Sequence, residues 1–279
     1  MLEKILAMHD MPRDVKTIPP KISIGLVVYN GAEHIRGALD SIVRQSYQNI
    51  ELIVVDGGST DDTRNILGEY AEHISVLVSE PDKGIYDAMN KVNSLATGDW
   101  LIFLGCDDVL FDVLGKVARL MILPDALYYG DVIFHSNGEI YGGKFSRRRL
   151  ARSNFCHQAV LYPKSAYKKN AYSMDYRWLA DYAYNLRLVG AGVPFIYVKE
   201  TVAIYNDKGA SSQGDAEFEK KKIGLICSSI GPMYAALELL RRLINFTAIA
   251  IGRVLKRLLP YACWKYFQVQ WRKMQKYFG

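Results

Sequence analysis

Two adjacent carboxylates follow an apolar segment in the first half of the chain. Residues 100–104 (WLIFL) have the composition of a buried strand, and Asp107 and Asp108 come just after it. Oxygen ligands at a strand end suit a hard divalent cation, and ligands of open α/β sheets bind beyond the strand ends. The pair suggests phosphate chemistry, whereas an isolated Asp pair is also typical of a solvated turn.

A second candidate follows residues 51–55 (ELIVV), where the chain continues as DGGSTDDT. Ser59 or Thr60 is expected to cap the next helix, and the acids after them suit the positive end of that helix. Capping does not explain Asp56. Its carboxylate, at a strand end, can accept hydrogen bonds from a nucleobase N–H or a ribose hydroxyl.

Three later segments carry further candidates. Lys83 and Gly84 precede the predicted helix 85–96, where an anionic group could bind. A basic stretch, residues 144–152, leads to His157 and Gln158. Asp181 lies in the first turns of a predicted helix over residues 176–188. On the residues alone, Asp181 is equally explained as a helix N-terminal acid, and His157 as a buried structural histidine.

Charge is unevenly distributed over the 279 residues, whose formal net charge is +6. Residues 231–279 contain nine Lys or Arg and one acid, a net +8, which leaves −2 for the rest. A mildly acidic body excludes a general nucleic-acid binder, since the basic footprint would lie on the folded domain. The four cysteines show no close pairing or metal-ligand spacing, so we expect reduced thiols in a cytosolic protein.

The first half of the chain alternates predicted strands and helices with short connections. Strands are expected at residues 22–29, 50–55, 74–78 and 100–104, and helices at 33–46, 60–70 and 85–96. Continuous apolar strands between helices predict an α/β fold, a mostly parallel sheet covered on both faces. The dinucleotide glycine fingerprint and the Lys-Ser/Thr phosphate loop are missing, which disfavours a dehydrogenase or an ordinary NTPase. From residue 127 the pattern changes to short strands and turns.

The ends of the chain are expected to differ from this body. Residues 1–20 lack the apolar core of a signal peptide and are interpreted as a lead-in segment. Residues 21–230 form the predicted catalytic domain, and residues 231–279 a basic, amphipathic helical extension. Its uncharged run, residues 243–252, is too short to span a membrane, which needs about 20 apolar residues. The extension fits a membrane surface, or a helix pair packed on the body or in a dimer.

Together these motifs resemble, in order and spacing, the family 2 glycosyltransferases with a GT-A fold. The resemblance covers roughly residues 21–205 and is similar to bacterial enzymes of colanic-acid, exopolysaccharide and O-antigen assembly, including lipopolysaccharide. It rests on VVYN at 27–30, IVVDGGSTD at 53–61, EPDKGIYDAMNK at 80–91 and FLGCDD at 103–108. It implies a Rossmann-like, mostly parallel sheet flanked by helices. Gly105 stands where many relatives have an acid, and Met89 where many have an arginine.

The resemblance also implies roles for individual residues. It assigns Asp181 as the general base and Asp108, with Asp107, as ligands of Mn²⁺ or Mg²⁺. The residues that it places around the nucleotide sugar are Tyr29, Asn30, Asp56, Lys83, Gly84, Asn90, Asp107, His157 and Gln158. The expected reaction is an inverting transfer of one hexosyl or N-acetylhexosaminyl group from a UDP-, GDP- or dTDP-linked donor to an acceptor hydroxyl.

The remaining expectations concern partners and competing functions. The acceptor is expected to be a lipid-linked saccharide, and the protein to sit peripherally on the cytoplasmic face of the inner membrane or in the cytoplasm. An anionic membrane surface and a second subunit are the expected partners of the extension. The alternatives are a sugar nucleotidyltransferase, which normally has an N-terminal phosphate loop, and an inactive membrane-surface scaffold with the same fold.

Overall fold

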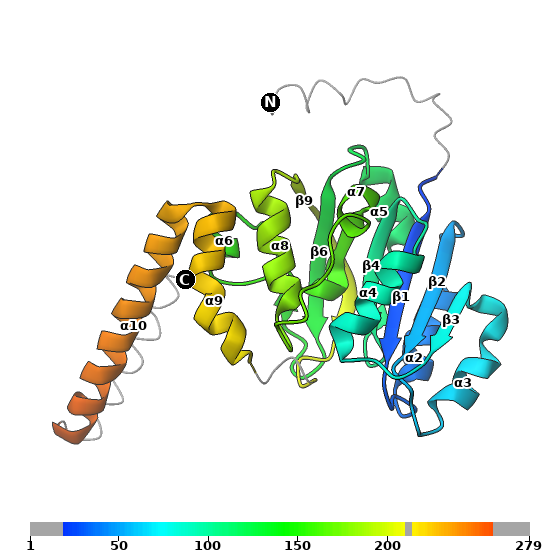
Figure 1. Cartoon of the computed structure of the whole chain (residues 1–279), viewed down its shortest axis with the longest axis horizontal. Coiled ribbons are helices and arrows are strands. Elements are labelled where there is room, and N and C mark those ends of the chain that lie inside the picture. Colours follow the sequence, from blue (N-terminus) through cyan, green and yellow to red (C-terminus); the bar gives the residue numbers. More distant parts are fainter. Residues whose placement is uncertain (1–18, 210–213, 259–279) are drawn as a thin grey trace.

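The computed structural model describes residues 19–209 and 214–258 of the chain (Figure 1). The predicted lead-in segment, except for its last two residues, lies outside the described residues. So do residues 259–279 of the predicted extension, with Cys263.

The first half of the chain forms the parallel part of the sheet. Its strands lie in the order β3-β2-β1-β4, and each neighbouring pair is parallel. The elements are β1 (Ile22–Val28), α2 (Ile35–Val43), β2 (Ile50–Asp56), α3 (Thr63–Glu69), η2 (Ala71–His73), β3 (Val76–Ser79), α4 (Ile85–Leu95) and β4 (Trp100–Gly105). This half confirms the predicted alternation of strands and helices.

The second half extends the same sheet with mixed pairing. After β4 the order continues β8-β6-β9-β5, with β7 paired to β6; only β6 and β9 are parallel there. The elements are β5 (Val109–Leu110), α5 (Leu114–Leu120), β6 (Leu127–Phe134), β7 (Ile140–Tyr141), α6 (Arg147–Leu150), η3 (His157–Ala159), β8 (Val160–Pro163), α7 (Lys164–Tyr167), α8 (Ala180–Gly190) and β9 (Phe195–Tyr205). The short turn at Gly138, whose φ is 71°, makes β6 and β7 an antiparallel hairpin.

Helices cover both faces of this sheet, as the apolar strands predict. Successive strand residues point to opposite faces, so Leu101 packs with one core and Ile102 with the other. The core around Leu101 joins the sheet to α4 and α8, while the core around Ile102 joins it to α2, α3 and α5. The fold is an α/β sheet with its helices in two layers (Figure 1).

Helix α8 begins later than the predicted residue 176. The backbone N–H groups of Trp178 and Leu179 donate to the Asp215 carboxylate, at 2.9 and 3.3 Å. The segment is therefore held by a side chain far along the sequence, and the helix starts at Ala180. Asp181 still lies in the first turn, as expected.

Two further helices follow the sheet, α9 (Ala216–Ile230) and α10 (Pro232–Leu258). Gly231, with φ of 114°, separates them, and proline is well suited to the first position of a helix. Helix α9 packs between α8 and α10, and α10 projects beyond the body (Figure 1). Within the described residues, no helix is both long and apolar enough to cross a membrane.

Candidate functional site

The loops that follow β1, β2 and β4 meet at one edge of the sheet. These three strands are parallel neighbours, so their carboxyl ends lie side by side. The edge therefore brings together Asn30 after β1, Asp56 at the end of β2 and the pair Asp107 and Asp108 after β4. The predicted candidates of the first half share one region.

Asp108 is buried at this edge, with 1% of its surface exposed. Its Oδ2 accepts the Gly105 N–H at 2.9 Å and its Oδ1 accepts the Asn206 N–H at 3.0 Å. The Gln158 side chain also hydrogen-bonds to it. Burial, with the neighbouring charge of Asp107, raises the pKa of Asp108 to about 6. The backbone around it fixes the carboxylate in one orientation.

Asp107 lies beside it, and its Oδ2 accepts the Asn206 side-chain N–H at 2.8 Å. A Cβ on Gly105 would lie 2.7 Å from the Asp108 Oδ2 and 2.9 Å from the Asp107 Oδ1. The two carboxylates therefore converge over a position that only glycine leaves open. An acid at position 105, expected from many relatives, would collide with both.

This donor set fits a divalent cation that shares its ligands with a substrate. No cluster of three or more His, Cys, Asp or Glu able to hold a metal occurs within residues 19–209 and 214–258. Mg²⁺ is commonly held by one or two carboxylates together with substrate phosphates and water. Asp107 and Asp108 supply two carboxylates that meet over Gly105, which is enough for that mode of binding.

Asp56 is fully buried at the end of β2 and anchors the loop after it. Its Oδ1 accepts the N–H and hydroxyl of Ser59, at 2.9 and 2.5 Å. Its Oδ2 accepts from Ser79 at 2.6 Å and from Arg64 at 3.3 Å. Burial alone would raise the pKa of Asp56, but these hydrogen bonds outweigh it and hold the pKa below its ordinary value. Its contact with a nucleoside stays a prediction.

Asn30 shapes the adjoining loop after β1. Its φ is 49°, in the left-handed region that Asn tolerates. Its N–H donates to the Ser59 hydroxyl and its Oδ1 accepts the Thr60 N–H, both at 2.8 Å. Neither Ser59 nor Thr60 caps α3 as we expected, because these contacts tie the two loops together, and the N-cap is Asp62. Tyr29 stays 63% exposed at this edge.

Lys83 and Gly84 lead into α4, as predicted. Lys83 is exposed, and Gly84 adopts φ of 119° just before the first helical turn. Asn90, farther along α4, makes two hydrogen bonds with the backbone of Tyr172. Its Nδ2 donates to the Tyr172 carbonyl oxygen at 3.0 Å, and its Oδ1 accepts the Tyr172 N–H at 2.8 Å. This pairing ties α4 to the segment before α8, so Asn90 has a structural role whether or not it lines a nucleotide site.

Asp181 faces the sheet from the first turn of α8 and is 9% exposed. Its Oδ1 accepts the Tyr86 hydroxyl at 2.8 Å, and its Oδ2 accepts the Asn154 side-chain N–H at 2.6 Å. Burial raises the pKa of Asp181 to about 6, and the hydrogen bonds oppose that rise. A carboxylate with a pKa near neutrality is suited to exchange a proton.

His157 and Gln158 lie in η3, between these two acidic centres. The His157 ring stacks on Phe103 at 5.2 Å, and burial lowers the pKa of His157 to about 3, so the ring is neutral. Its Nε2 is buried without a hydrogen-bond partner among the described residues. The adjacent Cys156 thiol has its pKa raised by burial and by both Asp108 and Asp181. Asp108, just after β4, and Asp181, on α8, thus border one region.

The sequence reasoning did not identify the residues that hold these carboxylates. Asn206 binds Asp107 and Asp108 from the end of β9, while Tyr86 and Asn154 bind Asp181. Each partner is distant in sequence from the acid that it holds, so no local spacing could reveal it. The described thiols Cys106, Cys156 and Cys227 are unpaired, as expected.

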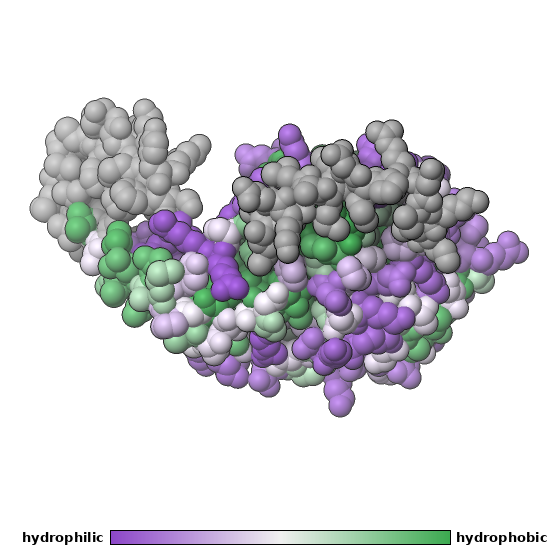
Figure 2. Space-filling view, turned by 90° about the horizontal axis from the view of Figure 1, so that it is seen from above, coloured by the Kyte–Doolittle hydropathy of each residue, from purple (hydrophilic) through white to green (hydrophobic). Residues whose placement is uncertain are grey.

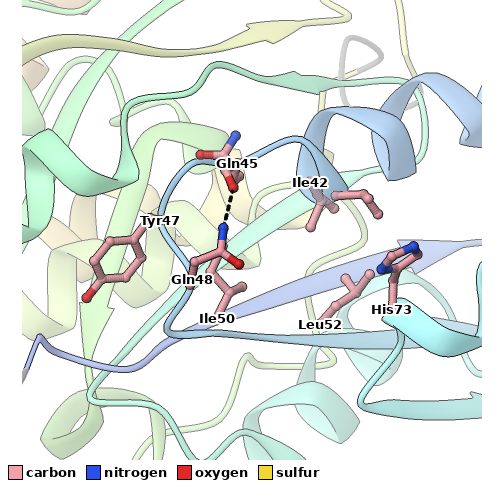
Figure 3. A pocket seen from close by; sticks show the side chains of 8 residues that line it. Ile42, Gln45, Tyr47, Gln48, Ile50, Leu52 and His73 are labelled. Carbon is pink, nitrogen blue, oxygen red and sulfur yellow. Dashed lines mark hydrogen bonds between the residues drawn. The ribbon is translucent and has the colours of Figure 1, made fainter.

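A small cavity of about 130 Å³ lies away from this edge (Figure 3). It is lined by the end of α2, the following loop, the start of β2 and His73. Ile50 and Leu52 contribute to it, whereas Asp56 lies at the other end of the same strand. The cavity is therefore separate from the carboxylates.

The sequence comparisons agree with this architecture. Residues 23–180 match the family described as glycosyl transferase family 2. The chain is 39% identical over 214 residues to the PGL/p-HBAD biosynthesis glycosyltransferase of Mycobacterium tuberculosis, which covers 72% of this chain and 84% of that protein. It is 35% identical over 125 residues to an uncharacterized glycosyltransferase of Rickettsia prowazekii, covering 45% of this chain and 38% of that protein.

Solved structures share the fold at lower identity. Residues 1–349 of TarS from S. aureus in complex with UDP-GlcNAc superpose with a TM-score of 0.62 at 18% identity, covering 75% of this chain and 66% of that one. The mannosyltransferase PcManGT from Pyrobaculum calidifontis, in complex with GDP-Man and Mn²⁺, gives a TM-score of 0.56 at 18% identity. It covers 96% of this chain and 90% of its own.

Proposed function

Because the chain belongs to glycosyl transferase family 2, we propose that it transfers one sugar, with inversion, from a nucleotide diphosphate sugar to an acceptor hydroxyl. Asp181 is the general base of this reaction, and Asp108 with Asp107 holds Mn²⁺ or Mg²⁺. The observation that carries the proposal is a pair of buried carboxylates, Asp108 just after β4 and Asp181 in the first turn of α8. Each is held in place by hydrogen bonds, and burial raises the pKa of each.

The mechanism is a single displacement at the anomeric carbon. Asp181 removes the proton of the acceptor hydroxyl, and the acceptor oxygen attacks as the bond to the diphosphate breaks. The Tyr86 hydroxyl and the Asn154 amide hold the two oxygens of the Asp181 carboxylate for this step. A divalent cation at Asp107 and Asp108 would offset the charge that develops on the leaving diphosphate.

The donor binds, in this proposal, at the strand edge. Asp56 and the Tyr29–Asn30 strand end contact the nucleoside, and Lys83, Gly84 and Asn90 line its site. His157 and Gln158 lie near the diphosphate or the acceptor. Two structural neighbours were solved with UDP-GlcNAc and with GDP-Man, which supports a nucleotide-sugar donor of the UDP, GDP or dTDP class. The group transferred is a hexosyl or N-acetylhexosaminyl group.

A thermal-shift screen tests the donor class directly. UDP-, GDP- and dTDP-sugars are each added with and without Mn²⁺, because a ligand that binds only the folded state raises the melting temperature by mass action. We expect one nucleotide class to raise it, and more so with the metal. A chain that no nucleotide sugar stabilises would support the inactive-scaffold alternative.

The acceptor is proposed to be a lipid-linked saccharide, as in bacterial surface polysaccharide assembly, reached from the cytoplasmic face of the inner membrane. The proposed extension begins at Gly231, which separates α10 from α9, and α10 packs on the body at Ala235 before it projects. Helix α10 exposes apolar side chains where it projects (Figure 2). The apolar residues of α10 that are at least 40% exposed are Met233, Leu237, Leu239, Leu240, Leu243, Ile244, Phe246 and Ile251.

The basic residues at the start of α10 are not free to attract lipid. Arg241 and Arg242 pair with the buried Glu238, at 2.6 and 3.2 Å, and Arg242 also pairs with Glu219 of α9. Attachment through residues 232–247 of α10 therefore depends on their apolar side chains more than on charge. The same face also fits a second copy of the chain, and gel filtration distinguishes a dimer from a monomer that binds a membrane.

A further inference from the structure

A line of buried and partly buried side chains connects strand β8 to Asp181. The Tyr162 hydroxyl donates to the Asn185 Oδ1 at 2.9 Å, and the Asn185 Nδ2 donates to the Asn154 Oδ1 at 2.8 Å. The Asn154 Nδ2 then donates to the Asp181 Oδ2 at 2.6 Å. These contacts link residues of β8, α8 and the segment before η3 in a single row.

The row has a direction. Each amide in it accepts with its oxygen and donates with its nitrogen, so every hydrogen points toward Asp181. The Tyr86 hydroxyl lies at 2.8 Å from the other carboxylate oxygen and at 2.7 Å from the Trp178 carbonyl oxygen, so it shares one proton between them. An ionised carboxylate only accepts, so the Asn154 donor favours its ionised form and fixes its orientation.

The burial of the row argues that it serves Asp181. Tyr162 and Asn185 are fully buried, and buried polar groups are costly unless every member is satisfied. The first-turn position of Asp181 could be held by helix packing alone, without the buried Asn185 and the partly buried Asn154 in succession. Among the described contacts, the Asn154 amide spans Asn185 and Asp181, so it is the link on which the orientation of the carboxylate depends.

We propose that Asn154 is a positioning residue, which holds the Asp181 carboxylate ionised and aimed at the acceptor hydroxyl through the hydrogen-bonded row from Tyr162. The proposal rests on the assignment of Asp181 as the general base. Asn154 itself need touch neither donor nor acceptor.

The tyrosines, the thiol and the histidine around Asp181 do not titrate near neutrality. Tyr86 of α4, Tyr162 of β8, Tyr172 before α8 and Cys156 before η3 all have pKa values raised mainly by burial, and all stay neutral. His157, next along the chain, is held neutral by a lowered pKa. Asp108, whose pKa burial also raises to about 6, titrates in the same range. The acidic limb of turnover, its fall at low pH, therefore reports both acids. A shift of this limb in an Asn154 variant reports Asp181, because Asn154 hydrogen-bonds to Asp181.

The pH profile of turnover tests the proposal in the full chain. Wild type should lose turnover as the pH falls through about 6, because protonated Asp181 cannot accept a proton. Asn154→Ala removes a donor to the ionised form, so the limb should move up by about one pH unit. At about pH 8, where the base is ionised, turnover should fall about tenfold through lost orientation, with donor affinity unchanged.

Asn154→Asp is the second variant, of equal size, in case the alanine variant does not fold. It replaces the donor by an acceptor, so its limb should move up further than that of Asn154→Ala. Asn93→Ala is the matched control, since Asn93 is another buried asparagine and its amide has no hydrogen-bond partner within the described ranges. The control should leave the limb in place.

The outcomes separate the positioning role of Asn154 from the assignment of Asp181 as the general base, on which that role rests. Limbs that stay at the wild-type pH in both Asn154 variants, with a lowered melting temperature alone, would show a structural role and overturn the proposal. If Asp181→Asn keeps normal turnover, the assignment of the base fails first, and the positioning role fails with it. Loss of turnover in Asp181→Asn together with unmoved limbs would overturn the positioning role alone.

Discussion

The strand edge buries charged side chains, whereas helix α10 exposes apolar ones. At the strand edge, carboxylates are buried and each is held by hydrogen bonds from distant segments. On α10, apolar side chains are exposed, while Arg241 and Arg242 pair with Glu238 and with Glu219 of α9. Buried charge indicates chemistry on a small ligand, and exposed apolar surface indicates a large partner. The strand edge is built from this chain alone, whereas the exposed face of α10 fits a partner.

The largest expected effect comes from breaking the acidic pair. Asp108→Ala should remove metal-stimulated turnover, a loss of about a thousandfold, because the diphosphate charge is then poorly stabilised. The measurement is turnover with and without Mn²⁺, with the melting temperature as a check on folding. The exposed Asp125→Ala serves as the matched control. A variant with normal metal stimulation would transfer the role to Asp107.

A second change tests the exposed region. Leu240→Glu combined with Ile244→Glu should lower co-sedimentation with anionic vesicles about tenfold or more, since each buried leucine or isoleucine contributes about 1.5–3 kcal/mol. Glutamates at the exposed Leu120 and Ile122 of the body are the control. Unchanged vesicle binding, with a dimer converted to a monomer in gel filtration, would assign this face to a second subunit.

The smallest expected effect concerns the junction between the two regions. Asp215 caps α9 by accepting the Phe218 N–H at 3.0 Å, and it also holds Trp178 and Leu179 before α8. Asp215→Ala should lower the free energy of unfolding by about 1–2 kcal/mol, measured by urea denaturation. An unchanged value would mean that the start of α8 is fixed by packing instead.

Local patterns predicted the frame of the molecule well. The short strands predicted from residue 127 begin with β6, and the predicted parallel strands are β1 to β4, because apolar runs and turn residues act locally. The start of α8 was placed too early, since Asp215 captures the preceding backbone from a remote position. Helix boundaries of this kind depend on tertiary contacts.

The candidate site was predictable in its acids but not in their supports. Asp56, Asp107 and Asp108 follow apolar strands, so the fold class alone places them at one edge. Asn206 and Asn154 carry no such signal, because each acts across the fold from an irregular segment. The reason for a glycine at position 105 also could not be predicted, because it depends on two carboxylates that converge over it in the structure.

The proposed mechanism depends most on Asp181 as the general base, and one set of measurements on Asp181→Asn tests this role. The substitution keeps the size and much of the hydrogen bonding of the side chain. We predict that turnover falls by about 10²–10⁴-fold, as for a lost general base, while donor affinity and melting temperature hardly change. A loss of about 0.3–1 kcal/mol in stability with near-wild-type turnover would instead make Asp181 a helix-terminal acid and contradict the mechanism.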